Sequence, residues 1–181
     1  MNNVNKNKQN ETLNGDYLNR IELKFGFVPN IYKAFLNSDN ALVNYLELSK
    51  SESNLSDKEK IIVKLAVSEV NGSNYSLSQY THIGLKRSLN TNETIESRKG
   101  RFTSDEKFNA LAELSFSIAQ NRGKIEPGIL NNFFKAGYTK AILMDLFLVV
   151  GEIIIANYIA QTLKLAIDFP WAPYINPKVN L

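Results

Sequence analysis

The sequence predicts an all-α fold, a compact bundle of roughly seven to nine helices built around a helical hairpin. Apolar residues recur at helical spacing in one segment after another, and helix-start signals precede several of these segments. No segment alternates apolar and polar residues in the way a half-buried strand requires. The apolar fraction of 44% is ordinary for a globular protein and sufficient for a core.

The N-terminal part divides into a polar segment and a periodic one. Residues 1–15 are rich in asparagine and bury too little apolar surface to offset the entropy of ordering, so we expect a disordered tail. Residues 16–181 then form a single domain. Its first helix runs from Asp16 and ends at Gly26, and shorter helices follow at about 30–35 and 40–48.

Two capping boxes, Ser or Thr followed three residues later by Glu, predict helix starts at Ser56 and at Thr103. The first opens a hairpin of two helices joined by the turn Asn71-Gly72 and reaching Leu89. The second opens a helix that ends at Gly123. Residues 90–101 between them are expected to be a solvated, charged loop.

The last two helices also have start signals. Pro127 suits the first turn of one helix, and Thr139 caps the longest helix, which should run to about Ile167. That helix is apolar enough to resemble a membrane span, but Asp145, Glu152 and Asn157 interrupt it, so we expect a central buried helix, or one that also contacts a partner subunit.

The two carboxylates on this apolar helix must be paired or functional. No lysine or arginine lies one turn from Asp145 or Glu152, so any cationic partner has to come from another helix or another subunit.

The hairpin carries the most informative motif. Ser73, Ser76 and Tyr80 follow the Asn-Gly turn at spacings of three and four, which places them on one face of the second helix. Ser73 is suited to cap that helix, whose free backbone N–H groups favour anions.

This run, Asn71-Gly72-Ser73-x-x-Ser76-x-x-x-Tyr80, resembles the alkylhydroperoxidase D and carboxymuconolactone decarboxylase superfamily, whose redox members carry Asn-Gly-Cys-x-x-Cys-x-x-x-His on a helix hairpin. Residues 26–32, 155–158 and 168–170 are similar to its peroxidase-related branch, so the likeness spans roughly residues 20–173. The resemblance implies an alkylhydroperoxidase D-like fold and a homo-oligomer.

The chemistry of the redox members is not retained. Both cysteine positions are serine, the histidine position is Tyr80, and the position of the proton-relay glutamate falls on Ile61. A serine hydroxyl is too weak an acid to act as a nucleophile without a nearby base.

Two interpretations of the motif positions stay open. Ser73, Ser76 and Tyr80 either line a polar pocket in place of the redox pair, or serve as a cap, a first-turn serine and a core tyrosine. Glu69, four residues before Ser73, could supply an acid or base beside Tyr80, or be a solvated charge at a helix end. His82 lies off the Ser76 face, so a Ser–His pair is expected only across a subunit contact.

Composition excludes several functions. The chain has no cysteine and one histidine, so it cannot use a cysteine redox cycle or form a multi-histidine metal site within one chain. We expect no cofactor and no metal. The basic cluster Arg98, Lys99 and Arg101 lacks interleaved aromatic residues, so we expect no nucleic acid partner. No apolar signal region precedes the domain, which predicts a cytoplasmic protein without a membrane partner.

Three functions remain as hypotheses. The first is a ligand-binding or interaction scaffold that has lost thiol chemistry. The second is an acid–base enzyme, such as a decarboxylase of small carboxylic acids, with Tyr80, Glu69 and His82 as candidates. The third is the peroxidase-like antioxidant role that the resemblance implies, against which the missing thiols argue.

Overall fold

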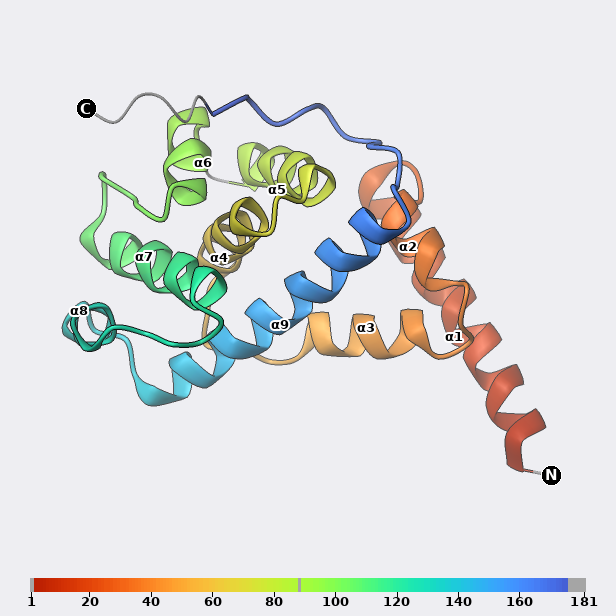
Figure 1. Cartoon of the computed structure of the whole chain (residues 1–181). Coiled ribbons are helices and arrows are strands. Elements are labelled where there is room, and N and C mark those ends of the chain that lie inside the picture. The colour runs from red at the N-terminus through yellow and green to blue at the C-terminus, as the bar shows by residue number, and fades with distance from the viewer. Residues whose placement is uncertain (1, 88, 176–181) are drawn as a thin grey trace.

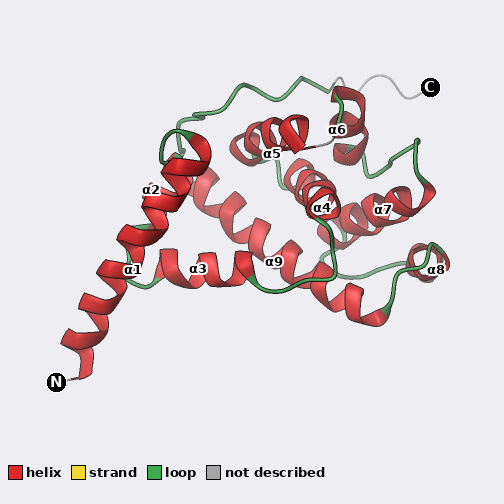
Figure 2. Cartoon of the chain, turned by 180° about the vertical axis from the view of Figure 1, so that it is seen from behind, coloured by secondary structure: helices red, strands yellow, loops and turns green. Residues whose placement is uncertain are grey.

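The computed structural model describes the backbone of residues 2–87 and 89–175, and the side chains of these residues from Leu13 on. The predicted all-α class is confirmed, because the described residues form helices and no strand (Figure 2). In chain order the helices of the described part are α1 (Asn2–Phe25), α2 (Asn30–Phe35), α3 (Ala41–Lys50), α4 (Asp57–Val70), α5 (Asn74–Arg87), α6 (Thr91–Arg98), α7 (Glu106–Gln120), α8 (Pro127–Lys135) and α9 (Lys140–Thr162).

Helix α4 is the centre of the domain. Every residue from 61 to 68 is buried, as expected of a helix enclosed on all sides. Helices α5, α6, α7 and α9 pack around it, and Figure 1 shows α4 between α5 and α7 with α9 passing in front. The hairpin of α4 and α5 is therefore the element on which the other helices are assembled.

A second layer forms where the N-terminal helices meet α9. Helices α2 and α3 contact α9, and α1 crosses α3 and packs against it (Figure 1). Phe35 of α2 stacks on Tyr45 of α3 with ring centroids 4.2 Å apart. This layer places α1, α3 and α9 around one end of the hairpin.

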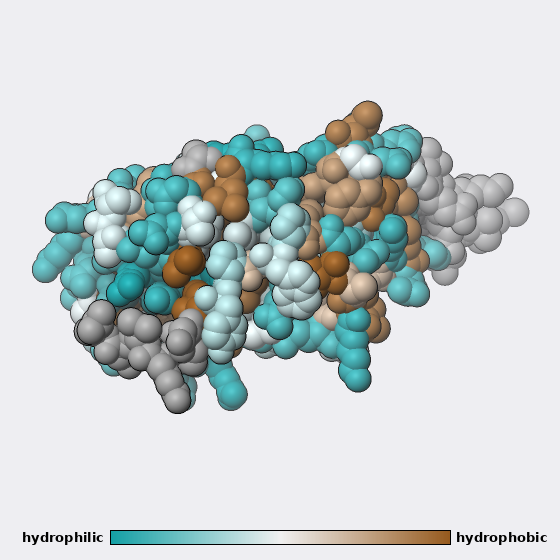
Figure 3. All heavy atoms as spheres, turned by 90° about the horizontal axis from the view of Figure 1, so that it is seen from above, coloured by the Kyte–Doolittle hydropathy of each residue, from teal (hydrophilic) through white to brown (hydrophobic). Residues whose placement is uncertain are grey.

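The segment after α9 crosses the outside of α5 toward α6 (Figure 1). The Ala172 amide donates to Ser78 Oγ at 3.2 Å, and Asp168 accepts from the Tyr75 hydroxyl at 2.8 Å. Phe169 lies among aromatic rings, with its centroid 5.9 Å from that of Phe25. Seen from above, this side of the molecule has apolar atoms in separate areas among polar ones (Figure 3).

Three of the predicted helix starts are confirmed. Ser56 and Glu59 form a complete capping box, Pro127 is the first residue of α8, and the Thr139 hydroxyl accepts from the Ile142 amide at 3.2 Å. These signals are local, so they depend little on tertiary structure.

The expected start of the first helix at Asp16 is wrong. Helix α1 is continuous through Gly15, a residue that costs a helix only about 1 kcal/mol. Asn14 is buried and donates to the Asp39 carbonyl at 3.3 Å, which fixes this turn against the loop after α2. The division into tail and single domain otherwise stays a prediction.

Residues 90–101 are not the loop we expected. Asn90 and Glu93 form a capping box that starts α6, and Arg98 at its end is buried. The second predicted capping box is also wrong: Asp105 caps α7, whereas the Thr103 hydroxyl donates to Glu96.

The last helix is shorter than predicted, and it ends at Thr162 rather than near Ile167. Lys164 has a φ of 50°, a left-handed conformation that stops a helix, and the Leu165 amide turns back to the Ala160 carbonyl at 2.9 Å.

Among the described residues, α9 is the one helix that is long and apolar enough to cross a membrane by length and composition. Its contacts with α4 and the ion-paired Glu152 on it match the expected central helix of a folded domain.

Candidate functional site

The hairpin turn has the predicted geometry. Gly72 has a φ of 67°, a left-handed value that glycine adopts without strain, and the Ser73 amide donates to the Ser68 carbonyl at 3.0 Å. The Ser73 carbonyl then accepts the first backbone bond of α5, from the Leu77 amide. The turn therefore presents Ser73 and Ser76 on the first turn of α5.

These two serines form a closed contact. Both are 0% exposed, and the Ser73 hydroxyl donates to Ser76 Oγ at 3.3 Å. No carboxylate, imidazole or amine of the described residues hydrogen-bonds to either hydroxyl. In this structure the pair has neither access to solvent nor a neighbouring base.

Tyr80, one turn further along α5, belongs to a different environment. Its hydroxyl lies 3.4 Å from Lys64 Nζ of α4. Lys64 Nζ is 2.7 and 2.8 Å from the two carboxylate oxygens of Glu152 on α9. The Tyr45 hydroxyl of α3 donates to the same carboxylate at 3.2 Å. These four residues, the Lys64 cluster, join four helices in the interior.

The Lys64 cluster follows from the cost of burying charge. The Lys64 and Glu152 side chains are 10% and 4% exposed, and an unpaired ion at such depth is strongly unfavourable. The prediction that Glu152 takes its partner from another helix is confirmed. Lys64 itself was not singled out; the signal was a lysine within the apolar run Ile61–Val67.

Both phenols of the cluster stay protonated at neutral pH. Burial and then the Glu152 charge raise the pKa of Tyr80 well above its ordinary value. Burial and then the neighbouring Tyr80 and Glu152 do the same for the pKa of Tyr45. Tyr80 and Tyr45 therefore keep their protons and do not act as bases: Tyr45 donates to Glu152, and the Tyr80 oxygen accepts from Lys64.

Two hollows open on either side of the cluster. Lys64 and Tyr80 lie at the floor of a cavity of about 160 Å³. Its lining comes from α1, α2, α3, α4 and α5: Lys24, Phe25, Tyr32, Ser49, Asp57, Lys60, Ile61, Lys64, Tyr80, Ile83 and Arg87. We call it the Lys64 cavity.

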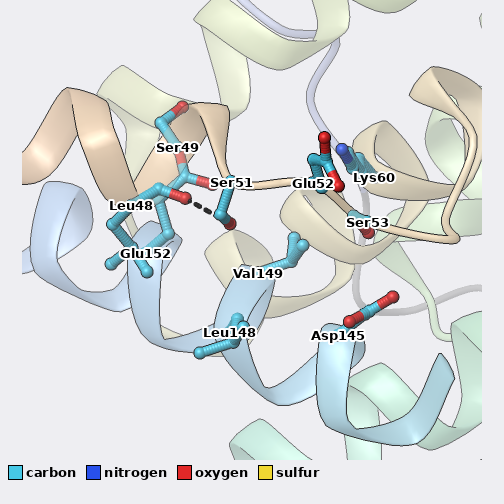
Figure 4. A pocket seen from close by; sticks show the side chains of 10 residues that line it. All are labelled: Leu48, Ser49, Ser51, Glu52, Ser53, Lys60, Asp145, Leu148, Val149 and Glu152. Atoms are coloured by element: carbon cyan, nitrogen blue, oxygen red, sulfur yellow. Dashed lines mark hydrogen bonds between the residues drawn. The ribbon is translucent and has the colours of Figure 1, made fainter. Parts of the chain in front are cut away.

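Glu152 lines the second hollow, a crevice between the loop after α3 and helix α9 (Figure 4). Its volume of about 10 Å³ admits no more than one water molecule. Asp145 lies at its edge, where its carboxylate accepts from the Asn54 amide at 2.7 Å. Asp145 thus holds the loop after α3 in place, whereas Glu152 is the counterion of Lys64.

Glu69 is not near the cluster. Its carboxylate pairs with the buried Arg98 of α6 at 2.7 Å, and Arg98 also donates to the Pro173 carbonyl at 2.6 Å. Glu69 and Arg98 therefore fasten the C-terminal segment to the hairpin. The proposed acid–base pair of Glu69 with Tyr80 is not formed.

His82 faces the C-terminal segment. Its ring centroid lies 5.8 Å from that of Phe169, and partial burial followed by the Lys86 charge lowers the pKa of its imidazole. It has no contact with Ser76, as its offset on the helix predicted. Ile61, at the position of the family's glutamate, is buried in the core.

Among the described residues, no group of three His, Asp or Glu side chains is arranged to hold a metal ion. The site thus consists of one ion pair, two phenols and a partly apolar cavity. Such a site can bind and orient a small molecule.

Comparison with known proteins identifies the fold. No family model and no curated protein matches the sequence. A peroxidase-related protein of Silicibacter sp. TM1040 matches in structure with a TM-score of 0.72 and 19% identity, over 84% of this chain and 83% of that one. A protein of Ralstonia eutropha JMP134, described as an alkylhydroperoxidase AhpD core, matches with a TM-score of 0.73 and 13% identity, over 81% and 80%.

The debrominase Bmp8, as a cysteine-to-alanine variant in complex with 2,3,4-tribromopyrrole, matches with a TM-score of 0.71 and 15% identity, over 82% of this chain and 81% of that one. The chain therefore has the alkylhydroperoxidase D-like fold, as its hairpin motif predicted. At these identities the comparisons define the fold alone.

Proposed function

We propose that this chain is a small-molecule-binding protein of the alkylhydroperoxidase D-like fold that works without thiol chemistry. The observation that carries the proposal is the Lys64 cluster at the floor of a cavity, one turn beyond a sealed pair of serines. Clefts with a few convergent polar groups on partly apolar walls are the usual form of ligand sites.

The contrast between the two ends of the motif supports binding at Tyr80. Ser73 and Ser76 occupy the positions of the redox pair but are enclosed by packing. Tyr80 occupies the histidine position and reaches a hollow together with a buried ammonium group. The scaffold of the hairpin thus keeps one polar position within reach of a ligand.

An acid–base enzyme is the second candidate. Its support is the Lys64 ammonium group beside a phenol and a carboxylate, a set of groups that can position a bound substrate. The raised pKa of Tyr80 opposes a role for it as a base. Binding alone therefore explains the cluster with fewer assumptions than turnover does.

Peroxide reduction by the route of the redox members needs one thiolate to attack oxygen and a second thiol to resolve the product. With no cysteine in the chain, we expect no peroxide consumption when a dithiol reductant is supplied. Turnover that survives metal removal in this assay would contradict the expectation.

The test of the binding proposal is a thermal-shift screen with small organic acids, lactones, amides and alcohols, followed by titration of each hit. We expect at least one hit whose affinity falls roughly tenfold in Tyr80→Phe, since a buried donor to a ligand contributes about 1–2 kcal/mol. Tyr138→Phe is the matched control, because Tyr138 is a buried phenol bonded to Glu59 outside the cavity.

A well-folded protein with no hit, or hits that both variants bind equally, would contradict the proposal. A hit that is also chemically converted would favour the enzyme.

We also propose a homo-oligomer assembled through the outer face of α9. Large apolar side chains are exposed on this face and just beyond its end: Met144, Phe147, Leu148, Ile155, Tyr158 and Leu163. They expose on the order of 500 Å² together, against about 800 Å² per partner in a standard interface, and an apolar groove beside Ile155 extends the surface.

Analytical ultracentrifugation tests the assembly: a dimer or larger species is expected at micromolar concentration. A monomer at high concentration, or sedimentation unchanged by Phe147→Glu, would contradict it. Cytoplasmic location stays a prediction.

A further inference from the structure

The Lys64 cavity is lined by four cationic side chains and one carboxylate. The cations are Lys24 of α1, Lys60 and Lys64 of α4, and Arg87 of α5, and the carboxylate is Asp57. The chain as a whole carries a formal charge of only +3, so this concentration of positive charge is local. A cavity lined by one sign of charge attracts ligands of the other sign.

Two of these cations already have carboxylate partners. Lys64 is paired with Glu152 behind the cavity floor, and Arg87 with Asp57 at its exposed mouth. In the described part of the chain neither Lys24 nor Lys60 is in an ion pair with a carboxylate. Positive charge therefore exceeds negative charge around the cavity.

The cations also disfavour one another. Desolvation, followed by the charges of Arg87 and then Lys64, lowers the pKa of Lys24, and only Asp57 acts in the opposite direction. Lys60 also faces Asp145. The pKa of Asp145 is lowered mainly by the hydrogen bonds from Asn54, and the charge of Lys60 lowers it further. An anion placed among Lys24, Lys64 and Arg87 would relieve this repulsion.

Apart from Ser49, the remaining lining is apolar or aromatic. Phe25, Ile61 and Ile83 supply hydrocarbon surface, and Tyr32 and Tyr80 supply rings. The volume of about 160 Å³ is close to that of a protein cavity known to take benzene, of about 150 Å³. The space therefore suits a ligand with a body of about six carbons.

We propose that the Lys64 cavity binds a small organic monoanion, with its charged group toward Lys64 and Tyr80 and its apolar body against Phe25, Ile61 and Ile83. This inference rests on the proposed ligand-binding function and adds the charge and size of the ligand. Lys64 Nζ donates to the Tyr80 hydroxyl oxygen, so the phenol keeps its own proton to donate to an acceptor-only anionic head group.

A phosphate group is a poorer match. Phosphate sites in proteins commonly use free backbone N–H groups at a helix N-terminus. The N-terminus of α4, beside the mouth, is occupied by its own capping box, in which the Ser56 hydroxyl accepts from the Glu59 amide at 3.3 Å.

The test compares ligands that share a ring and differ in charge: benzoate and benzenesulfonate as anions, and benzamide as the neutral analogue. Titration calorimetry at constant ionic strength should show that both anions bind at least tenfold tighter than benzamide. Inorganic phosphate should weaken benzoate binding no more than sodium chloride added to the same ionic strength does.

Charge-changing variants make the inference sharper. Lys24→Gln should weaken benzoate roughly two- to fivefold, as expected of a partly exposed charge. Arg20→Gln, one turn earlier on α1 and outside the cavity lining, should leave the affinity unchanged.

The decisive variant is Glu152→Gln, which removes the carboxylate that holds Lys64 but keeps the shape of the side chain. The buried ammonium group then lacks a counterion, and a bound anion can replace it. We expect Glu152→Gln to bind benzoate roughly tenfold tighter than the wild type and to regain thermal stability when benzoate is added.

Equal affinity for benzoate and benzamide, or a Glu152→Gln variant that benzoate neither binds more tightly nor stabilises, would overturn the anion inference. In that case neutral ligands that lose affinity in Tyr80→Phe would still support the ligand-binding function. Absence of any ligand, charged or neutral, would overturn both.

Discussion

The first and second turns of α5 both carry hydroxyl side chains of the motif, but the surroundings of these hydroxyls differ. At the first turn, the Ser73 and Ser76 hydroxyls satisfy each other at 3.3 Å and are fully enclosed. At the second, the Tyr80 hydroxyl meets an ammonium group that is itself held by a carboxylate 88 residues further along the chain. Two neutral hydroxyls can satisfy each other with one hydrogen bond. The buried Lys64–Glu152 ion pair instead has further polar neighbours, Tyr80 and Tyr45, and lies beside a cavity.

The comparison teaches that the polar positions of one motif can differ in burial and in their charged neighbours. A neutral pair of serines costs little to bury once its hydroxyls are hydrogen-bonded. A lysine on the central helix costs much more, so its retention beside a hollow is harder to explain by packing alone. The proposed ligand site therefore lies at the second turn.

The largest effect should come from breaking the ion pair of the second turn. Lys64→Met leaves Glu152 buried without a counterion and should lower the free energy of unfolding by about 3–5 kcal/mol. The double variant Lys64→Met with Glu152→Leu should recover most of this loss, since an apolar pair of similar volume needs no counterion. Urea denaturation measures both.

If the single and double variants lose the same free energy, the pair contributes only through packing, and the contrast between the two turns is lost. Ser73→Ala serves as the reference from the first turn. It removes one hydroxyl of a neutral pair and should cost only about 1 kcal/mol.

The next effect concerns the burial of Ser73 and Ser76 at the first turn of α5. The variant Ser73→Cys with Ser76→Cys restores two thiols at the motif spacing, but in an enclosed contact. Their reaction with a thiol reagent requires local opening, so it should be on the order of a hundredfold slower than that of an exposed thiol. The rate for Ser104→Cys, at an exposed position on another loop, provides the comparison.

Rapid labelling of both new thiols, at the rate of the Ser104→Cys control, would show that the first turn opens freely. The difference between the two turns would then be one of chemistry and not of access.

Much of the fold could be predicted because it is encoded locally. Helical periodicity and caps such as Ser56 and Thr139 place helices without knowledge of their neighbours. Helix α6 was missed because its sequence is short and polar, and the Asn90–Glu93 capping box was its one clear signal. Helix α1 was started too late because its first turns are polar and rich in asparagine, a composition that we interpreted as a disordered tail.

The candidate site could be predicted only in part. The motif spacing identified Tyr80, and the cost of a buried charge identified Glu152 as a residue that needs a distant partner. Lys64 could not be assigned as that partner, because local spacing carries no information about which face of α4 meets α9. Glu69 and His82 lie near the motif in sequence, but their neighbours Arg98 and Phe169 come from segments whose path depends on tertiary packing.

The smallest effect tests the outer face of α5, where His82 packs beneath Phe169. Because the folded protein lowers the pKa of this imidazole, the unfolded chain takes up a proton first as the pH falls below about 6.5. His82 should therefore oppose folding progressively as the pH is lowered through this range, and not above it. The exposure of the ring limits the effect to a few tenths of a kcal/mol.

The measurement is the difference in unfolding free energy between the wild type and His82→Gln, taken once at pH 7.5 and once at pH 5. Carboxylates present in both proteins titrate alike, so their contribution cancels in this difference. This difference should shift in favour of the variant at pH 5. Lys86→Gln should reduce the shift, because the Lys86 charge is the second cause of the lowered pKa. A difference independent of pH would show that the C-terminal segment does not constrain His82, and that the outer face of α5 is open to water where its inner face is sealed.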